Sequence, residues 1–94
     1  AYLSPADRAL APRLYLSLQQ GAKLLASGRS MRVQNIVRAV EKSLSDTPKI
    51  RIEYVDLVEP DTLEKLTQAR RPALLAAAVR LGQTRLIDNI LVRP

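Results

Sequence analysis

The side chains that most often do chemistry in enzymes are scarce in this chain, which contains no histidine and no cysteine. Their absence excludes imidazole-based acid–base catalysis, a catalytic triad, and metal sites built from imidazole or thiolate within this sequence. Asp56 and Glu59 come closest to a general acid/base pair, but they sit at the end of a predicted strand, where charged residues commonly meet solvent. The aspartates are dispersed, and the three glycines form no phosphate-binding loop. We therefore predict no catalytic, substrate-binding or metal-ligating residue.

The most distinctive polar cluster is formed by Arg85, Asp88 and Asn89, which stand between two apolar segments. We expect residues 84–89 to form a polar turn. In a helical turn, Arg85 and Asp88 would lie three positions apart and could pair, and Asn89 tolerates a left-handed backbone. Two interpretations stay open: the cluster fixes the entry into the last strand, or Arg85 reaches a neighbouring domain or an anionic ligand.

The sheet that would position this cluster is organised around residues 73–79, an unbroken apolar run. The run is too short to span a bilayer and has the length of a strand buried on both faces. Gly82 ends it, and residues 90–92 form a second apolar segment that we predict to pair with it. Apolar and charged side chains alternate at the start of residues 49–58, which predicts a third, half-buried strand. We expect the loop over residues 59–70 to be the most mobile segment.

Helical signals fill the first part of the chain. Ser4 and Pro5 mark a helix start, and Asp7 completes a Ser-x-x-Asp capping box. Because proline removes a backbone donor, we expect a short helix over residues 5–10, a break at Pro12, and a longer helix beyond it. One side of this region carries apolar residues at helical spacing, namely Leu10, Leu14, Leu18, Ala22 and Leu25.

A second helix is predicted further along. The first ends near Ser27 with Gly28 as its cap, Ser30 can cap the second, and the second ends before Pro48. Its apolar stripe comprises Val33, Ile36, Val37, Val40 and Leu44. Because both stripes are typical of core faces that lie on a sheet, we predict an α+β fold. It is a two-layer domain with a small three-stranded, mainly antiparallel sheet covered by two main helices.

The charge of the chain is high but scattered. The net charge is +6, yet only Arg70 and Arg71 are adjacent among fifteen basic residues. No aromatic platform for stacking bases accompanies them. We therefore favour the interpretation that these charges lie on solvated faces, and we rank contact with an anionic surface second and DNA or RNA binding third.

The length fits one domain, and no apolar run approaches the roughly 20 residues of a membrane helix. We expect a cytoplasmic protein without a membrane partner and, because the sequence lacks an initial methionine, a fragment of a longer polypeptide.

Several blocks of sequence carry a family resemblance. They are Tyr2-Leu3-Ser4-Pro5, Ala11-Pro12-x-Leu14-Tyr15, Ile52-Glu53-Tyr54-Val55 followed by Pro60-Asp61-Thr62-Leu63, and Leu81-Gly82-x-Thr84-Arg85-Leu86-Ile87-Asp88-Asn89. With these blocks the chain resembles, nearly end to end, the C-terminal domain of the pantothenate synthetase (pantoate–β-alanine ligase) family. The last block is the most specific of the set.

The resemblance implies an enzyme with an N-terminal Rossmann-like catalytic domain and a C-terminal domain, residues 1–94 here, that closes over the active site as a lid. Such an enzyme uses ATP and Mg to condense pantoate with β-alanine through a pantoyl adenylate, releasing pyrophosphate and AMP. The family's histidine-containing motif and its Ser-Ser-Arg-Asn motif have no counterpart in this sequence. The resemblance therefore assigns no catalytic residue and no cofactor to this chain, and it implies that the isolated chain is inactive.

The resemblance also suggests where the domain moves and what it meets. We place the C-terminal side of the hinge at Ala1, Tyr2, Leu3 and Ser4. The implied partners are the N-terminal catalytic domain and, in the whole enzyme, pantoate, β-alanine and ATP, with a homodimer as the expected assembly and no nucleic acid. Some members of the family are fused to a cytidylate kinase, and the sequence leaves open whether such a domain follows this chain.

The competing hypothesis is an independent basic α+β module that binds RNA or an acidic protein partner.

Overall fold

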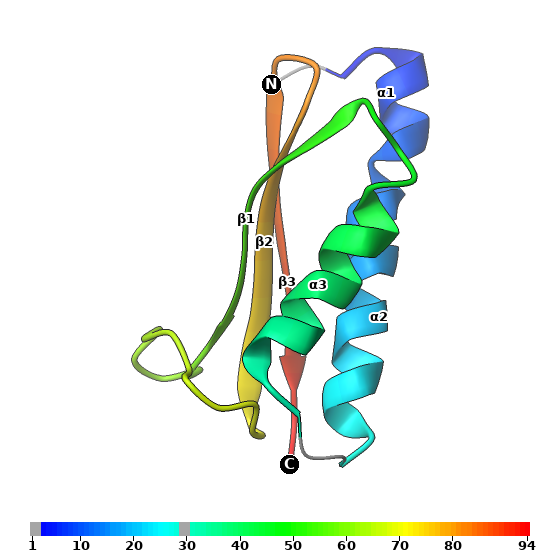
Figure 1. Cartoon of the computed structure of the whole chain (residues 1–94). Helices are drawn as coiled ribbons and strands as arrows, with labels where there is room; N and C mark the ends of the chain where they lie inside the picture. Colours follow the sequence, from blue (N-terminus) through cyan, green and yellow to red (C-terminus); the bar gives the residue numbers. More distant parts are fainter. Residues whose placement is uncertain (1–2, 29–30) are drawn as a thin grey trace.

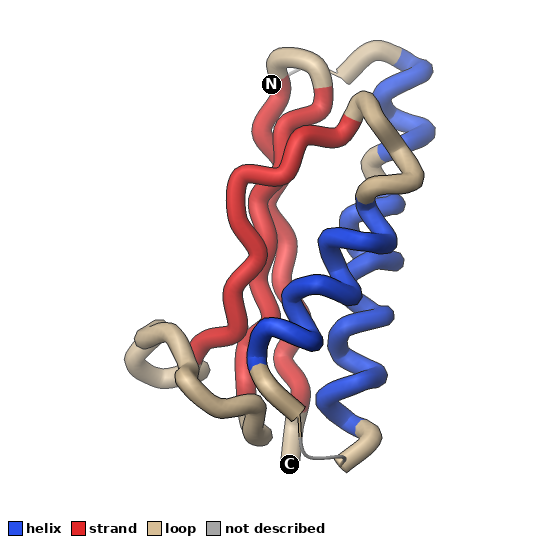
Figure 2. The backbone as a smooth tube through the Cα atoms, in the orientation of Figure 1, coloured by secondary structure: helices blue, strands red, loops and turns tan. Residues whose placement is uncertain are grey.

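The computed structural model describes residues 3–28 and 31–94. Its elements are, in order, α1 (Pro5–Leu10), α2 (Pro12–Ala26), α3 (Val33–Leu44), β1 (Ile50–Val58), β2 (Ala73–Leu81) and β3 (Thr84–Val92). The strands form one layer, and α2 and α3 pack side by side over one face of it (Figure 1, Figure 2). The predicted two-layer α+β class is confirmed. Within the described residues, no helix combines the length and apolar character that crossing a membrane requires.

β2 lies at the centre of the sheet and runs antiparallel to β1 on one side and β3 on the other. Leu81 pairs with Thr84, so only Gly82 and Gln83 connect β2 to β3. Gly82 has a φ of +64°, a value that glycine adopts without steric cost in a two-residue hairpin. The polar turn predicted over residues 84–89 is therefore wrong. The glycine allows the turn to close sooner, and these residues belong to β3.

The break between α1 and α2 falls at Pro12, as predicted. The Oγ atom of Ser4 accepts a hydrogen bond from the backbone N–H of Asp7 at 3.1 Å and so caps α1. Pro12 takes the first position of α2, where its missing N–H costs least. At the other end of α2, Gly28 has a φ of +75°, the left-handed conformation typical of the residue that follows a helix.

Among the described residues, no side chain caps the start of α3. Its N-cap position is occupied by Arg32, whose side chain makes no capping hydrogen bond. Ser30, which the sequence suggested as the cap, lies outside the described residues, and the helix begins at Val33. The predicted end of the helix before Pro48 is confirmed, since α3 stops at Leu44.

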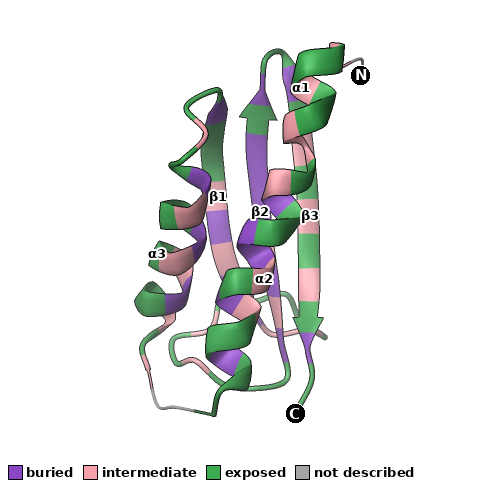
Figure 3. Ribbon diagram, turned by 90° about the vertical axis from the view of Figure 1, so that its right-hand side faces the viewer, coloured by how far each residue is buried: buried purple, intermediate pink, exposed green. Residues whose placement is uncertain are grey.

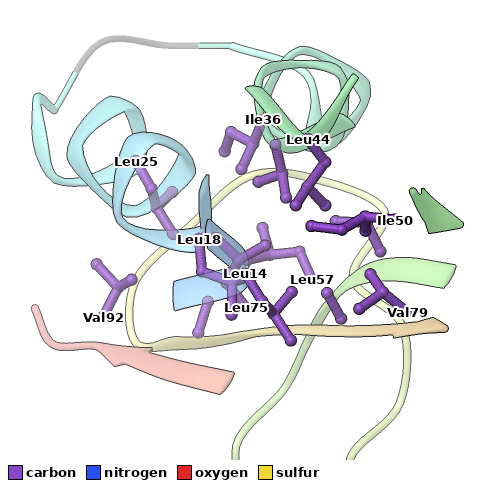
Figure 4. Packing of buried hydrophobic residues seen from close by; sticks show 14 of the residues in the cluster. Leu14, Leu18, Leu25, Ile36, Leu44, Ile50, Leu57, Leu75, Val79 and Val92 are labelled. Carbon is purple, nitrogen blue, oxygen red and sulfur yellow. The ribbon is translucent and has the colours of Figure 1, made fainter. Parts of the chain in front are cut away.

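The core lies between the two long helices and the sheet (Figure 3, Figure 4). Both helical stripes predicted from the sequence face it. The helices contribute Leu14, Leu18, Leu25, Ile36, Val40 and Leu44. The strands contribute Ile50, Val55, Leu57, Ala73, Leu75, Ala77, Val79, Leu81 and Val92.

Gly21 allows α2 to lie close to both α3 and the sheet. A Cβ atom at this position would come within 2.7 Å of Val40 Cγ2 and 2.8 Å of Leu75 Cδ2, closer than carbon atoms pack. Beside this contact, the hydroxyls of Ser17 and Ser43 hydrogen-bond at 2.8 Å, and Ser17 is fully buried. The Nη2 atom of Arg13 also donates a hydrogen bond to the backbone carbonyl of Ser43 at 3.2 Å. The two helices are therefore joined by this close approach and by these polar contacts.

Candidate functional site

The two faces of the sheet differ in what covers them. Alternation along the strands, together with their register, divides the side chains into an inner face toward α2 and α3 and an outer face away from them. The inner face comprises the core residues of the strands named above. The outer face comprises Arg51, Glu53, Tyr54, Asp56, Val58, Leu74, Ala76, Ala78, Arg80, Arg85, Ile87, Asn89 and Leu91.

Three arginines stand in a row across the outer face. Arg51 of β1 pairs with Arg80 of β2, and Arg80 pairs in turn with Arg85 of β3. We call Arg51, Arg80 and Arg85 the arginine ladder. Because neighbouring strands are roughly 4.8 Å apart, the ladder spans roughly 10 Å of backbone. Like charges placed directly opposite one another destabilise a sheet, so this arrangement needs a counter-charge.

Glu53 supplies that counter-charge from a β-bulge. The register of β1 shifts between Ile52 and Tyr54, which makes Glu53 the extra residue. The Nε atom of Arg80 donates to its Oε2 at 3.1 Å, and the Nε atom of Arg85 donates to its Oε1 at 2.5 Å. The hydrogen bond from Arg85, assisted by that from Arg80, lowers the pKa of Glu53 from its ordinary value of 4.5. The same contact raises the pKa of Arg85.

The arrangement leaves positive charge unbalanced. Three arginines face one glutamate, so the ladder and Glu53 together carry two net positive charges, three minus one. Among the residues that the structure describes, Arg51 has no ion-pair partner. The next carboxylate of the outer face, Asp56, lies 3.8 Å from the Nζ atom of Lys65. The outer face can therefore accept further anionic groups at the ladder.

The polar cluster predicted at Arg85, Asp88 and Asn89 is not formed as a unit. In an extended strand, residues three apart point to opposite faces and lie roughly 10 Å apart, so the pairing of Arg85 with Asp88 that a helical turn would have allowed does not occur. Arg85 and Asn89 lie on the outer face, whereas Asp88 is opposite the buried Ala77 on the inner face. Asp88 Oδ1 instead accepts a hydrogen bond from the backbone N–H of Asn89 at 2.8 Å. Asn89 has no positive φ, so it does not use the left-handed conformation that asparagine tolerates.

Two of the four predicted hinge residues are described. Leu3 is partly buried against the core, and Ser4 caps α1. Ala1 and Tyr2 lie outside the described residues. The hinge itself stays a prediction.

The carboxylates considered for acid–base chemistry have structural roles. Asp56 faces Lys65, as described above. Glu59 Oε2 accepts hydrogen bonds from the backbone N–H groups of Asp61, at 2.9 Å, and Thr62, at 2.7 Å. These bonds, that from Thr62 first, lower the pKa of Glu59, so the group is held as a carboxylate that organises the loop.

Two clefts on the described surface lie away from the arginine ladder. One, of about 490 Å³, runs between α2 and α3 past Lys23 and Lys42. Another, of about 710 Å³, lies between the start of α3 and residues 67–69, with Arg32 and Asn35 in its wall. Over residues 3–28 and 31–94, no three His, Cys, Asp or Glu side chains converge in a way that could hold a metal ion.

Sequence reasoning missed the ladder and its counter-charge. In the sequence, Arg51 and Glu53 are the charged residues of a strand in which charged and apolar side chains alternate. Arg80 is a single charged residue after an apolar run. Their meeting depends on strand register and on the bulge, which bring together residues 27 and 32 positions apart. A hairpin centred on Gly82 was the one available signal, because it would have placed Arg80 opposite Arg85.

Fold and outer face together define a class: a two-layer α+β domain with a cationic sheet face and, in its described part, no carboxylate cluster that could hold a metal ion. A sequence profile described as pantoate-beta-alanine ligase matches residues 1–91. The chain belongs to the pantoate–β-alanine ligase family, and its resemblance to the C-terminal domain of pantothenate synthetase is confirmed.

Individual relatives agree with this assignment. The chain is 40% identical over 93 residues to a bifunctional pantoate ligase/cytidylate kinase of Synechococcus sp. (strain JA-3-3Ab), covering 99% of this chain and 17% of that protein. It is 42% identical over 90 residues to pantothenate synthetase of Thermoanaerobacter sp. (strain X514), covering 96% and 31%. The crystal structure of pantothenate synthetase from Thermus thermophilus matches with a TM-score of 0.87 at 38% identity, covering 99% and 33%. The chain thus spans a third or less of the length of these relatives.

Proposed function

We propose that residues 1–94 form the C-terminal lid domain of an ATP-dependent ligase that condenses pantoate with β-alanine. The observation that supports this most directly is the match of nearly the whole chain to one part of the relatives named as pantothenate synthetase. The reaction proceeds through a pantoyl adenylate and releases pyrophosphate and AMP. ATP and Mg are bound by the N-terminal catalytic domain of the ligase, which this sequence does not include. The ligase is a cytoplasmic homodimer.

A lid suits an adenylate-forming reaction for a physical reason. Acyl adenylates hydrolyse readily, so an active site that forms one benefits from a rigid body that excludes water and then opens to release product. The chain has the properties of such a body: one continuous core and a cationic outer face. Closure over a site that holds ATP and carboxylates is favoured by positive charge, although each exposed charge contributes only about 1 kcal/mol or less.

The test uses the purified 94-residue chain and a separately produced catalytic domain of the ligase. Isothermal titration of the chain alone with ATP, pantoate and AMP should give no heat of binding. Adding the chain in trans should raise pantothenate formation by the catalytic domain. Micromolar ATP binding by the chain alone, or no effect on the catalytic domain, would contradict the lid role. Tight, salt-sensitive binding of generic RNA in a gel-shift experiment would favour the independent binding module instead.

The hinge belongs to the same proposal. Residues Ala1, Tyr2, Leu3 and Ser4 connect the lid to the catalytic domain, and Pro5 stiffens the point where α1 begins. Replacing Pro5 with glycine in the full-length ligase should change turnover, because glycine loosens the start of the lid. Unchanged kinetics would place the hinge elsewhere.

A further inference from the structure

The outer face has the composition of a docking surface. Beside the arginine ladder it exposes Ile87, 57% accessible, and Leu91, 43% accessible. Tyr54 lies half-buried in the same face. Protein interfaces are enriched in arginine and aromatic residues, and their buried centres are largely apolar. This surface combines these features on one side of a sheet.

The ladder is also arranged at a cost to the isolated domain. Each pair of arginines that stand opposite one another across adjacent strands destabilises the sheet, and Glu53 offsets only part of the repulsion. Both bonds to Glu53 come from Nε atoms, so neither uses the terminal amino groups of Arg80 or Arg85. These groups, and the whole guanidinium of Arg51, suit bidentate contacts with carboxylates. The charge that complements this face is therefore negative.

We propose that the outer face docks on a carboxylate-bearing surface of the ligase's own catalytic domain, with the arginine ladder forming the ion pairs across the contact. This inference rests on the proposed function, and it specifies which side of the lid meets its partner. The length of the relatives supports the choice of partner, since the chain accounts for 33% of the Thermus structure that it matches. Of the two faces of the sheet, the inner one is already filled by α2 and α3, so only the outer one is open to a contact.

The charge-reversal experiment uses Arg51→Glu, because Arg51 takes no part in the Glu53 contacts and its replacement leaves both of them intact. The matched control is Arg38→Glu on α3, another exposed arginine without an ion pair in the described part of the chain, but in the helical layer. We expect Arg51→Glu to weaken binding of the chain to the catalytic domain about tenfold, with the loss growing at low ionic strength, whereas Arg38→Glu leaves it unchanged.

A second measurement requires no substitution. Methyl groups of Ile87 and Leu91 should lose contact with a soluble paramagnetic probe in the NMR spectrum when the catalytic domain is added. Leu16, 46% accessible, and Leu24, 36% accessible, both on α2, should keep that contact. Folding of each variant is checked by its unfolding transition before binding is measured.

The outcomes separate the two proposals. Two results would show that the docking face is wrong while the lid role stands, provided that the chain raises pantothenate formation. One is that Arg51→Glu binds the catalytic domain as tightly as Arg38→Glu. The other is that the methyl groups of Leu16 and Leu24, and not those of Ile87 and Leu91, are protected from the paramagnetic probe. If no complex forms and activity is not raised, both proposals fall. If the methyl groups of Ile87 and Leu91 are protected from the probe in the chain alone at high concentration, the outer face binds a second copy of the chain and not the catalytic domain.

Discussion

The inner and outer faces of the same three strands have opposite characters. On the inner face, Leu75, Ala77 and Val79 are completely inaccessible to solvent under α2 and α3. On the outer face, Arg80 and Ile87 are exposed. The inner face defines the fold by burying aliphatic area, and the outer face is organised by charge. A sheet with helices on one side can therefore complete its core there and leave its other side open to solvent.

The outer face nevertheless has a thin apolar layer of its own. Ala78 is fully buried there although no helix covers it. Its cross-strand partners are Tyr54 on one side and Ile87 on the other, and these larger side chains shield it. Burial on this face therefore depends on neighbouring strands rather than on a second layer.

The largest expected difference between the faces comes from truncating one aliphatic side chain on each. Leu18→Ala removes a fully buried leucine from the core and should lower the free energy of unfolding by about 2–5 kcal/mol. Ile87→Ala removes a side chain that is 57% exposed, and should cost less than about 1 kcal/mol. Urea denaturation of the two variants and the parent chain measures both values. Equal losses would mean that the outer face belongs to the core.

A smaller effect tests how closely the layers approach. Gly21→Ala places a methyl group against Val40 and Leu75, and overpacking of this kind costs about 1–3 kcal/mol. Alanine has a better helix propensity than glycine, which offsets about 1 kcal/mol of this cost. We therefore expect a net loss of up to about 2 kcal/mol in the free energy of unfolding. Gln20→Ala, at the preceding exposed position of α2, changes propensity alone and should be nearly neutral. A Gly21→Ala chain as stable as the parent would show that the helices can move apart at little cost.

Local signals explain which parts of the fold could be predicted from the sequence. The cap at Ser4, the break at Pro12 and the helical stripes depend on neighbouring residues along one helix, so their chemistry is visible in a short window. The end of the β2–β3 turn was missed because Gly82 and Gln83 suffice to reverse the chain. The polar residues after them were taken for a turn although they belong to a strand, in which Arg85 and Asn89 face solvent.

The candidate site was harder to predict because its contacts are long-range. Arg85 was singled out as a residue that could reach a neighbouring domain, but its observed partner is Glu53 on the far strand. The bulge that aims Glu53 across the sheet has no marker in the sequence, since it contains neither glycine nor proline. Register sets the ladder, and register is a property of the paired strands together.

The smallest expected effect concerns the electrostatics of the outer face and its dependence on pH. The folded-state pKa of Glu53 is lowered, so its contribution to stability is fully present above the ordinary value of 4.5 and is lost as the pH falls through the folded-state pKa. Glu53→Gln removes this contribution and leaves the arginines without their counter-charge. We expect the variant to be less stable than the parent chain at neutral pH, with the gap closing as the pH is lowered below 4.5.

The difference in stability between the two chains is measured from their urea denaturation midpoints, from neutral pH down to about pH 3. The matched control is Glu41→Gln on α3, an exposed glutamate without an ion pair among the described residues, which should follow the parent chain throughout. The Glu53→Gln chain should still lose some stability in acid, because Glu59 also has a lowered pKa. The stability deficit of Leu18→Ala, which removes only apolar contacts, should instead stay constant over the same range. A Glu53→Gln deficit that is equally insensitive to pH would mean that Glu53 acts on the outer face through packing and not through its charge.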